Sequence, residues 1–283
     1  MRDFFKQYKK NKSAVVGLVI VTILLILAIF APFISPHLPH EQTLADRLLP
    51  PMWEEGGVST YVLGTDDFGR DLFTRIIYGA RISLMVGAVS VGVSLTFGLV
   101  MGLVAAFYGG KVDLIVMRVV DIMLSIPAIL LAIVIVSILG PSLTNAMIAI
   151  GVVGIPTYAR VVRASVLSER EKEYVIASRI NGSSNMRLMF KVILPNAATP
   201  IIVQSTMGFA SAVLEAAGLS FLGLGAQPPT PEWGAMLSDS LQFIMTAPWM
   251  IFYPGLAIFF TVLGFNLMGD GLMDVLDPKL KDK

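Results

Sequence analysis

The chain contains no cysteine and only two histidines among its 283 residues, and only 14% of its residues are charged. Without cysteine it can form no disulfide and offers no thiolate to a metal. His37 and His40 are separated by Pro39, which opposes the regular helix that would align two imidazoles on one ion. We therefore expect solvated loop histidines, no metal site and no catalytic residue in this chain.

The charge balance and a missing motif narrow the possible functions further. Lysine and arginine total 21 against 20 for aspartate and glutamate, so the net charge of +1 gives no sign of nucleic-acid binding. The sequence contains no G-x-x-x-x-G-K-[ST] run, whose backbone amides would cradle nucleotide phosphates. We expect no cofactor in this chain, and any energy from a nucleotide must come from another subunit.

Long apolar stretches are abundant instead. Hydrophobic residues make up 55% of the chain and the mean hydropathy is positive, beyond what soluble globular domains usually show. Six stretches approach the roughly 20 residues that cross a bilayer as a helix. They lie at 14–34, 82–108, 113–139, 142–162, 199–221 and 249–268. We predict an all-α membrane protein with six transmembrane helices.

The first stretch and the segment after it form a separate N-terminal part. The apolar run at 14–34 exceeds the roughly 7–15 residues of a signal-peptide core. It also lacks a clear cleavage site before Pro32, so we expect a retained anchor. We divide the chain into residues 1–81, with the anchor helix and an external loop, and residues 82–283, a five-helix transport core that includes the polar loop 164–198.

The distribution of basic residues predicts the orientation in the membrane. An even number of spans places both termini on one side, and lysine and arginine accumulate in cytoplasmic segments. Of the 21 basic residues, only Arg47, Arg70, Arg75 and Arg81 fall on the opposite side. Both termini and the 164–198 loop are therefore expected in the cytoplasm.

The 164–198 loop is a long polar segment between apolar spans. Ser168 and Glu171 fit a capping box, which predicts that a helix starts there. Gly182 is placed to end that helix in a left-handed turn, which glycine adopts without strain. A second short helix is expected over 185–193, closed by Pro195.

Two interpretations of this loop follow from its residues alone. Ala177 and Ser178 are small and would let the backbone enter the groove of a partner protein. An amphipathic hairpin lying on the membrane surface fits the same periodicity about equally well.

Arg118, Asp121 and Glu215 are charged residues within the predicted spans. Arg118 and Asp121 are one turn apart, so we expect them to pair, as a structural link, a contact with a partner or a gating element. Glu215 should face protein or water rather than lipid. It is either a pathway group that meets the ammonium end of a peptide or a fixed partner of an outer residue such as Arg81.

Glycines and prolines within the spans indicate helix contacts and breaks. Gly98 and Gly102 would allow close approach of a helix of a second subunit, or they reflect only how common glycine is in membrane helices. Pro127 and Pro254 each remove a backbone donor and are expected to kink or loosen their helices.

The polar loop resembles the EAA loop of ABC importer permeases, which docks on an ATPase subunit. The matching positions are Ile176-Ala177-Ser178, Gly182, Val192 and Leu194-Pro195. The chain has Ile176 where that family has glutamate, Ser178 in place of an alanine and Val192 in place of an isoleucine. Glu173 lies one turn earlier.

Further segments resemble the dipeptide, oligopeptide and nickel permease group within that family. These segments are Leu63–Asp71, Tyr78–Ser83, Leu219–Gly234, Phe265–Gly271 and Leu276–Pro278. The resemblance thus covers nearly the whole chain and is strongest to the second permease subunit of a dipeptide importer.

The resemblance implies a type I ABC importer permease fold and a non-enzymatic translocation subunit in the bacterial inner membrane. It also implies a second homologous permease, two cytoplasmic ATPases that use Mg-ATP, and an external solute-binding protein that delivers dipeptides or short oligopeptides. The residues expected to couple to the ATPase are Glu173, Ala177, Ser178, Gly182, Leu194 and Pro195.

Two alternatives remain open. A permease for nickel or another small solute would share this architecture. A secondary transporter working alone is less favoured, because such proteins often carry paired broken helices in repeated halves and no such repeat is evident.

Overall fold

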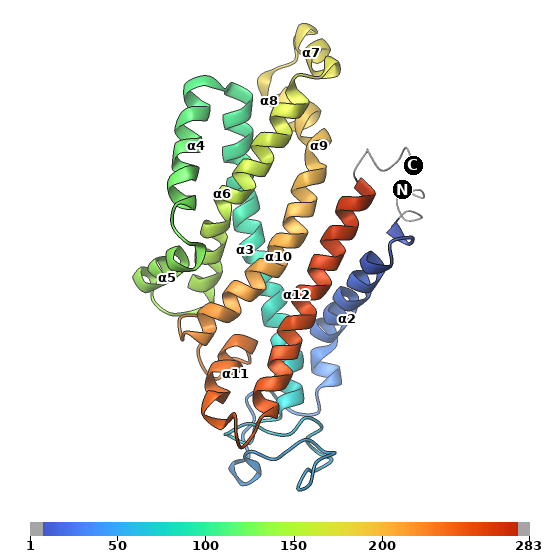
Figure 1. Ribbon diagram of the computed structural model, residues 1–283, viewed down its shortest axis with the longest axis vertical. Helices are drawn as coiled ribbons and strands as arrows, with labels where there is room; N and C mark the ends of the chain where they lie inside the picture. Colours follow the sequence, from blue (N-terminus) through green and yellow to red (C-terminus); the bar gives the residue numbers. More distant parts are fainter. Residues whose placement is uncertain (1–7, 277–283) are drawn as a thin grey trace.

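The computed structural model describes residues 8–276, and that part of the chain is helical, with one isolated bridge between Thr65 and Asp71 and no strand (Figure 1). Arg2, Lys6, the C-terminal lysines and the last two residues of the Leu276–Pro278 segment lie outside the described residues. The all-α fold predicted from the apolar stretches is confirmed.

Among residues 8–276, five helices are long and apolar enough to cross a membrane. They are α2 (Lys12–Ile34), α3 (Leu72–Tyr108), α6 (Leu143–Arg170), α10 (Ala198–Phe221) and α12 (Trp249–Leu276). Each contains one of the predicted spans in full, except that α6 starts one residue after the start of its predicted span, 142–162.

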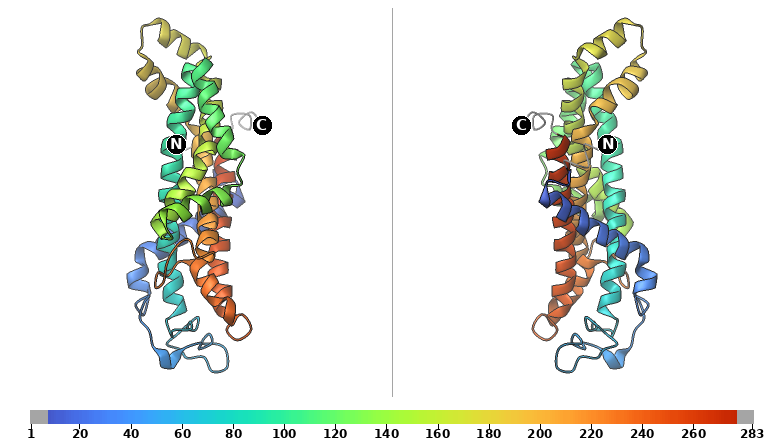
Figure 2. Two further views of the ribbon diagram at one scale, coloured as in Figure 1. Left: turned by 90° about the vertical axis from the view of Figure 1, so that its left-hand side faces the viewer. Right: turned by 90° about the vertical axis from the view of Figure 1, so that its right-hand side faces the viewer.

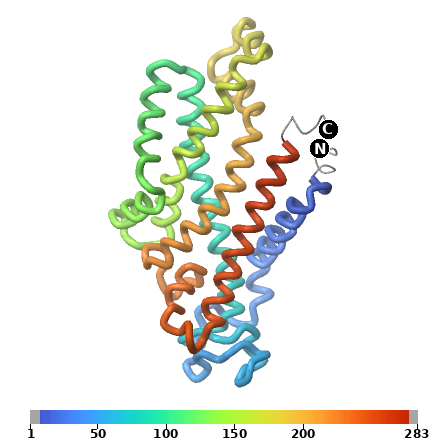
Figure 3. The backbone as a smooth tube through the Cα atoms, in the orientation of Figure 1, coloured from blue at the N-terminus to red at the C-terminus, as the bar shows by residue number. Residues whose placement is uncertain are grey.

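The third predicted span, 113–139, is broken at Pro127, where a kink or loosening is expected, and it is a sixth span only if its two helices are taken together. It consists of α4 (Gly110–Leu124) and α5 (Ala128–Leu139), which meet at 90°. Pro127 precedes α5 and disfavours helical backbone at the residue before it, so the chain turns abruptly there (Figure 3). α12, by contrast, continues through Pro254.

The bundle is built on the close approach of α3 and α6. A side chain at Gly98 would meet Tyr158, and a Cβ at Gly102 would lie 2.5 Å from the carbonyl oxygen of Ala159 and 2.8 Å from Cβ of Val162. Both glycines therefore make a contact within this chain. Small residues at these positions let the two backbones pack directly, as membrane helices often do.

The N-terminal helix joins the same bundle. α2 packs along α12 at Gly17, where a Cβ would lie 2.6 Å from the backbone nitrogen of Met268. Residue 81 lies inside α3, so no break between helices marks the predicted division at this residue. The division remains a prediction.

Shorter elements form the two ends of the molecule. One end carries α7 (Glu173–Ile180), α8 (Asn185–Arg187), the π-helix η2 (Leu188–Ile193) and α9 (Leu194–Asn196), which project beyond the bundle (Figure 2). The opposite end carries residues 35–71 with η1 (Leu44–Asp46), then α11 (Trp233–Ser240) and η3 (Leu241–Phe243). The first turn of α2 and the last turn of α12 point toward the α7 end (Figure 1).

The contact between α3 and α6 generates a test with an internal control. Gly102→Ala should lower the free energy of unfolding by about 1–3 kcal/mol, because the methyl group overlaps α6. Gly92→Ala lies on the same helix with no atom within 4 Å of the new Cβ and should be neutral or slightly stabilising. Thermal unfolding of the purified protein in detergent measures both. Equal loss in the two variants would contradict this account of the interface.

Candidate functional site

The polar hairpin, defined here as residues 171–197, begins later than the capping pattern predicts. α6 runs to Arg170 and contains Ser168, so a helix start at Ser168 is wrong, and α7 begins at Glu173 instead. The reason is tertiary: Val162, Val166 and Glu169 form one buried face that extends α6 past the local signal.

The predicted helix end at Gly182 is confirmed. Gly182 has φ +80°, and its N–H donates to the carbonyl of Arg179 at 3.0 Å. The N–H of Ser183 donates to the carbonyl of Ser178 at 3.2 Å. This pair of bonds is a Schellman motif, which requires left-handed backbone at its central residue.

The second helix of the hairpin begins at Asn185 as expected, but Pro195 does not close it. The chain continues through η2 and α9 into α10, and Ala197 is the one residue between α9 and α10. Pro195 stands in the first turn of α9, where its missing N–H disturbs little. The hairpin is therefore almost continuous with a membrane-spanning helix.

A small apolar core fixes the hairpin to the bundle. Val175, Leu188 and Ile193 are fully buried and belong to one cluster with residues of α3 and α6, among them Leu103 and Val162. Displacing the hairpin would expose this cluster, so the hairpin moves together with the ends of α3 and α6.

Polar contacts fix the angle between α6 and α7. The carboxylate of Glu169 accepts from Lys172 Nζ at 2.6 Å and from the Tyr174 hydroxyl at 2.5 Å. Burial and the bond to Glu169 raise the pKa of Tyr174 to about 12, which keeps its hydroxyl protonated as the donor. Arg170 Nη1 donates to the carbonyl of Ala106 at 2.6 Å and ties the same corner to α3.

The outer surface of the hairpin exposes apolar side chains at the end of the molecule. Ile180 is 79% exposed and Met186 63% exposed, and Ile176 and Phe190 are also exposed. Exposed apolar groups gathered on one projection are typical of a protein contact.

The other residues predicted to couple lie around this surface. Glu173, Ala177, Gly182 and Pro195 are exposed, whereas Ser178 and Leu194 are half-buried. The structure thus brings these six residues into one hairpin; their coupling role remains a prediction.

The predicted pair of Arg118 with Asp121 does not form. Asp121 instead pairs with Arg160 of α6 at 2.6 Å, while Arg118 is exposed. A second link between α4 and α6 joins Asp113 to Arg163 through two bonds, Arg163 Nε at 2.5 Å and Nη2 at 2.6 Å. Spacing along one helix could not reveal these links, because their partners are about forty and fifty residues apart.

A partly open cavity of about 200 Å³, with a mostly apolar lining, contains Glu215 in its wall. Its walls come from α3, α6 and α10, and it reaches the break between α4 and α5 at Leu124 and Ala128. The expected bond between Glu215 and Arg81 is absent: Arg81 is exposed and lies over the ring of Tyr78. Glu215 faces the cavity rather than lipid, as its charge requires.

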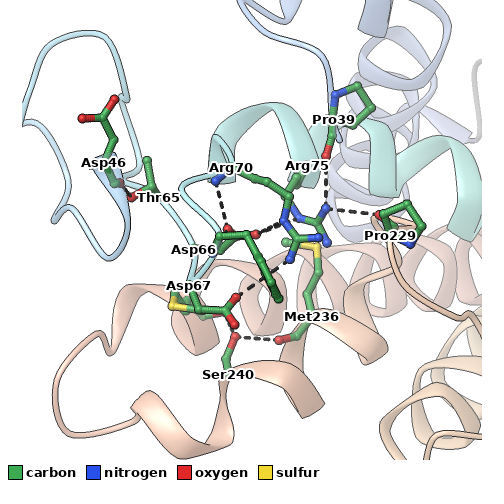
Figure 4. Close-up of polar contacts among 12 residues, drawn as sticks. Pro39, Asp46, Thr65, Asp66, Asp67, Arg70, Arg75, Pro229, Met236 and Ser240 are labelled. Atoms are coloured by element: carbon green, nitrogen blue, oxygen red, sulfur yellow. Dashed lines mark hydrogen bonds and ion pairs between the residues drawn. The ribbon is translucent and has the colours of Figure 1, made fainter. Parts of the chain in front are cut away.

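A buried charge network holds the opposite end of the molecule together (Figure 4). Asp66 accepts from Arg70 Nε at 2.6 Å and lies 3.4 Å from Arg75 Nε. Arg75 Nη1 also donates to the carbonyls of Pro39 at 3.1 Å and Pro229 at 3.3 Å. One carboxylate thereby joins the loop after α2, the start of α3 and the segment before α11.

Asp67 stands at the edge of this network. Its nearest contact with Arg70 is 3.9 Å, and burial followed by the charge of Asp66 raises the pKa of Asp67. In the sequence, this site corresponds to the charged run within Leu63–Asp71, which stands out by its resemblance to the permease group. The spacing of its residues does not show which of these charges pair with one another.

Comparison with known proteins places the chain among transport components. Residues 94–282 match the family "binding-protein-dependent transport system inner membrane component", and residues 1–51 match the "N-terminal TM domain of oligopeptide transport permease C". The chain is 54% identical to the dipeptide transport system permease protein DppC of Alkalihalophilus pseudofirmus, over 99% of this chain and 90% of that protein. It is 56% identical to DppC of Escherichia coli K12, over 99% of this chain and 94% of that protein.

A solved structure supports the fold. The inward-facing MetNI methionine ABC transporter matches with a TM-score of 0.60 and 22% identity, over 72% of this chain and 97% of that chain. This likeness confirms the permease fold of the bundle.

The buried network predicts a large difference between two neighbouring aspartates. Asp66→Asn should lower the free energy of unfolding by about 3–5 kcal/mol, since it removes the nearest counter-charge of two buried guanidinium groups. Asp67→Asn should have a much smaller effect, because Asp67 makes no close bond to Arg70. Thermal unfolding in detergent compares the variants, and a loss for Asp67→Asn as large as that for Asp66→Asn would contradict the assignment.

Proposed function

The chain belongs to the family of binding-protein-dependent transport system inner membrane components, and on this premise we propose that it is the translocation subunit of an ATP-driven dipeptide importer. The observation that carries the proposal is similarity of 49–56% identity to dipeptide permeases along 99–100% of the chain. The chain itself is not the enzyme; Mg-ATP is hydrolysed in two partner ATPase subunits.

The hairpin is the proposed contact with an ATPase. Its exposed apolar surface supplies the docking face, and its buried core and the Glu169 contacts make it a rigid extension of α3 and α6. Because α9 runs nearly without interruption into α10, movement of the ATPase reaches three membrane helices at once. Gly182 sets the turn, while Glu173, Ala177, Ser178, Leu194 and Pro195 shape the docking face.

The remaining partners follow from the same proposal. A second homologous permease completes the pathway, and an external solute-binding protein delivers the peptide at the end that carries residues 35–71 and α11. The nickel alternative gains little from His37, whose ring lies 5.2 Å from that of Tyr61 and whose Nε2 lies 3.4 Å from the carbonyl of Thr60.

The coupling proposal is tested in proteoliposomes that contain the complete complex and the binding protein. Gly182→Val should reduce ATP-driven dipeptide uptake at least about tenfold, because a β-branched residue resists a φ of +80°. Gly182→Asn should keep most of the uptake, since asparagine tolerates this conformation. Normal uptake by Gly182→Val would reject the assigned role of the turn, and absence of ATP-driven uptake by the unaltered complex would reject the function.

The proposed orientation, with termini and hairpin in the cytoplasm, is supported by the basic residues and by the common direction of α2, α12 and the hairpin. Because the chain has no cysteine, single cysteines report it directly. In intact cells, Ser59→Cys should react with an impermeant thiol reagent, and Ser183→Cys should react only after the membrane is opened. External labelling of Ser183→Cys would reverse the orientation.

A further inference from the structure

Glu215 is a carboxylate with no partner inside the bundle. It forms no hydrogen bond or ion pair with another described residue, although other carboxylates in the helices, such as Asp113 and Asp121, each bind an arginine. An ionisable group within a membrane bundle points to a functional partner. That partner must therefore come from outside this chain.

The groups around Glu215 identify the chemistry of the partner. Ser94 Oγ donates to the carbonyl of Gly151 at 2.7 Å, and Ser90 Oγ donates to that of Met147 at 3.0 Å. The Tyr158 hydroxyl donates to the carbonyl of Gln204 at 3.4 Å. Since these hydroxyl protons already have acceptors, the three groups present only oxygen lone pairs to the cavity.

The described residues that line the cavity offer Glu215 no positive charge. No lysine, arginine or histidine is among the described residues that line the cavity, and its side-chain donors without a hydrogen bond to another described residue are the amide of Gln204 and the hydroxyl of Thr157, both neutral. Acceptor oxygens around one carboxylate fit a compact cation with several N–H donors. A primary ammonium group has three such donors.

The cavity is too small for a complete peptide. Its volume of about 200 Å³ is below the roughly 300–1,000 Å³ of pockets that enclose small ligands. A cavity of this size has room for one end of a peptide, and the rest would lie outside it.

We propose that Glu215 and the acceptor-lined cavity form a subsite for the primary ammonium group of the transported peptide, which makes Glu215 a specificity-determining residue. This inference rests on the proposed dipeptide transport and adds to it where the amino end of the substrate is recognised. The carboxylate supplies the charge, and the hydroxyl oxygens of Ser90, Ser94 and Tyr158 line the same cavity.

The subsite can be measured without transport. Ser211 lines the same cavity one helical turn before Glu215, so Ser211→Cys introduces a single thiol of this chain beside the carboxylate. The assembled complex is treated with 2-aminoethyl methanethiosulfonate, which carries a primary ammonium, and separately with its anionic 2-sulfonatoethyl analogue. The rate at which each reagent modifies this chain is measured by mass spectrometry. Each rate is divided by the rate at which the same reagent modifies a free thiol in solution.

The charge of Glu215 should decide the outcome. The ammonium reagent should react at least about tenfold faster than the sulfonate, because a cleft lined by one sign of charge concentrates the opposite ion. Glu215→Gln should remove this preference, whereas Asp270→Asn, an exposed carboxylate on α12, should preserve it. Millimolar dialanine should slow the labelling and N-acetyl-dialanine should not. If the ratio of the two labelling rates is the same with glutamate and with glutamine at position 215, the proposed subsite is wrong.

Uptake separates this inference from the proposed function. Per assembled complex, Glu215→Gln should import dipeptide about tenfold more slowly than Asp270→Asn. Equal uptake by the two variants would overturn the role of Glu215 in substrate recognition even while the unaltered complex transports. If the unaltered complex imports no dipeptide, the proposed function fails, and the labelling ratio still reports whether the cavity selects an ammonium group.

Discussion

The contact between α3 and α6 is the constraint on which the rest of the structure depends. At Gly98 and Gly102 the two backbones approach too closely for any side chain to stand between them. The ends of these helices form the platform under the polar hairpin, and their central parts supply two walls of the cavity that contains Glu215. One interface therefore sets the geometry of the polar hairpin and of the cavity that contains Glu215 together.

Four carboxylates fall into two groups: three pair with arginine within the chain and join its segments, and Glu215 does not. Asp66 holds two arginines in a buried network, and Asp113 and Asp121 each fasten α4 to α6. These pairs are complete within the chain and explain how segments distant in sequence stay together. Glu215 differs because its surroundings contain acceptors but no counter-charge, which is the reason to look beyond the chain for its ligand.

Local signals predicted part of the fold, and tertiary contacts decided the rest. The apolar runs identified the membrane helices because length and hydropathy are properties of each segment, and Gly182 was identifiable because positive φ is a local demand. The cap at Ser168 failed since the buried face of α6 continues past it. Pro127 predicted a disturbance, but only the structure shows a 90° turn.

The candidate sites were predictable to different extents. The hairpin is contiguous, so its residues could be assigned together, whereas the partners of Asp121 and Glu169 depend on how separate elements meet in space. Arg118 and Asp121 have the spacing of a helical pair, yet Arg160 reaches Asp121 from α6 and takes that place. For Glu215, composition alone indicated a group shielded from lipid, and the acceptor character of its surroundings required coordinates.

The charge network around Asp66 has a consequence for the biogenesis of this end of the molecule. Proteins of oxidising compartments often secure their loops by disulfides, whose formation requires an oxidant. In this chain the end that carries residues 35–71 is closed by guanidinium and carboxylate groups that are less than one tenth exposed. Closure there needs no redox partner, is indifferent to thiol reductants and, because the ions are shielded from solvent, is only weakly sensitive to the salt concentration.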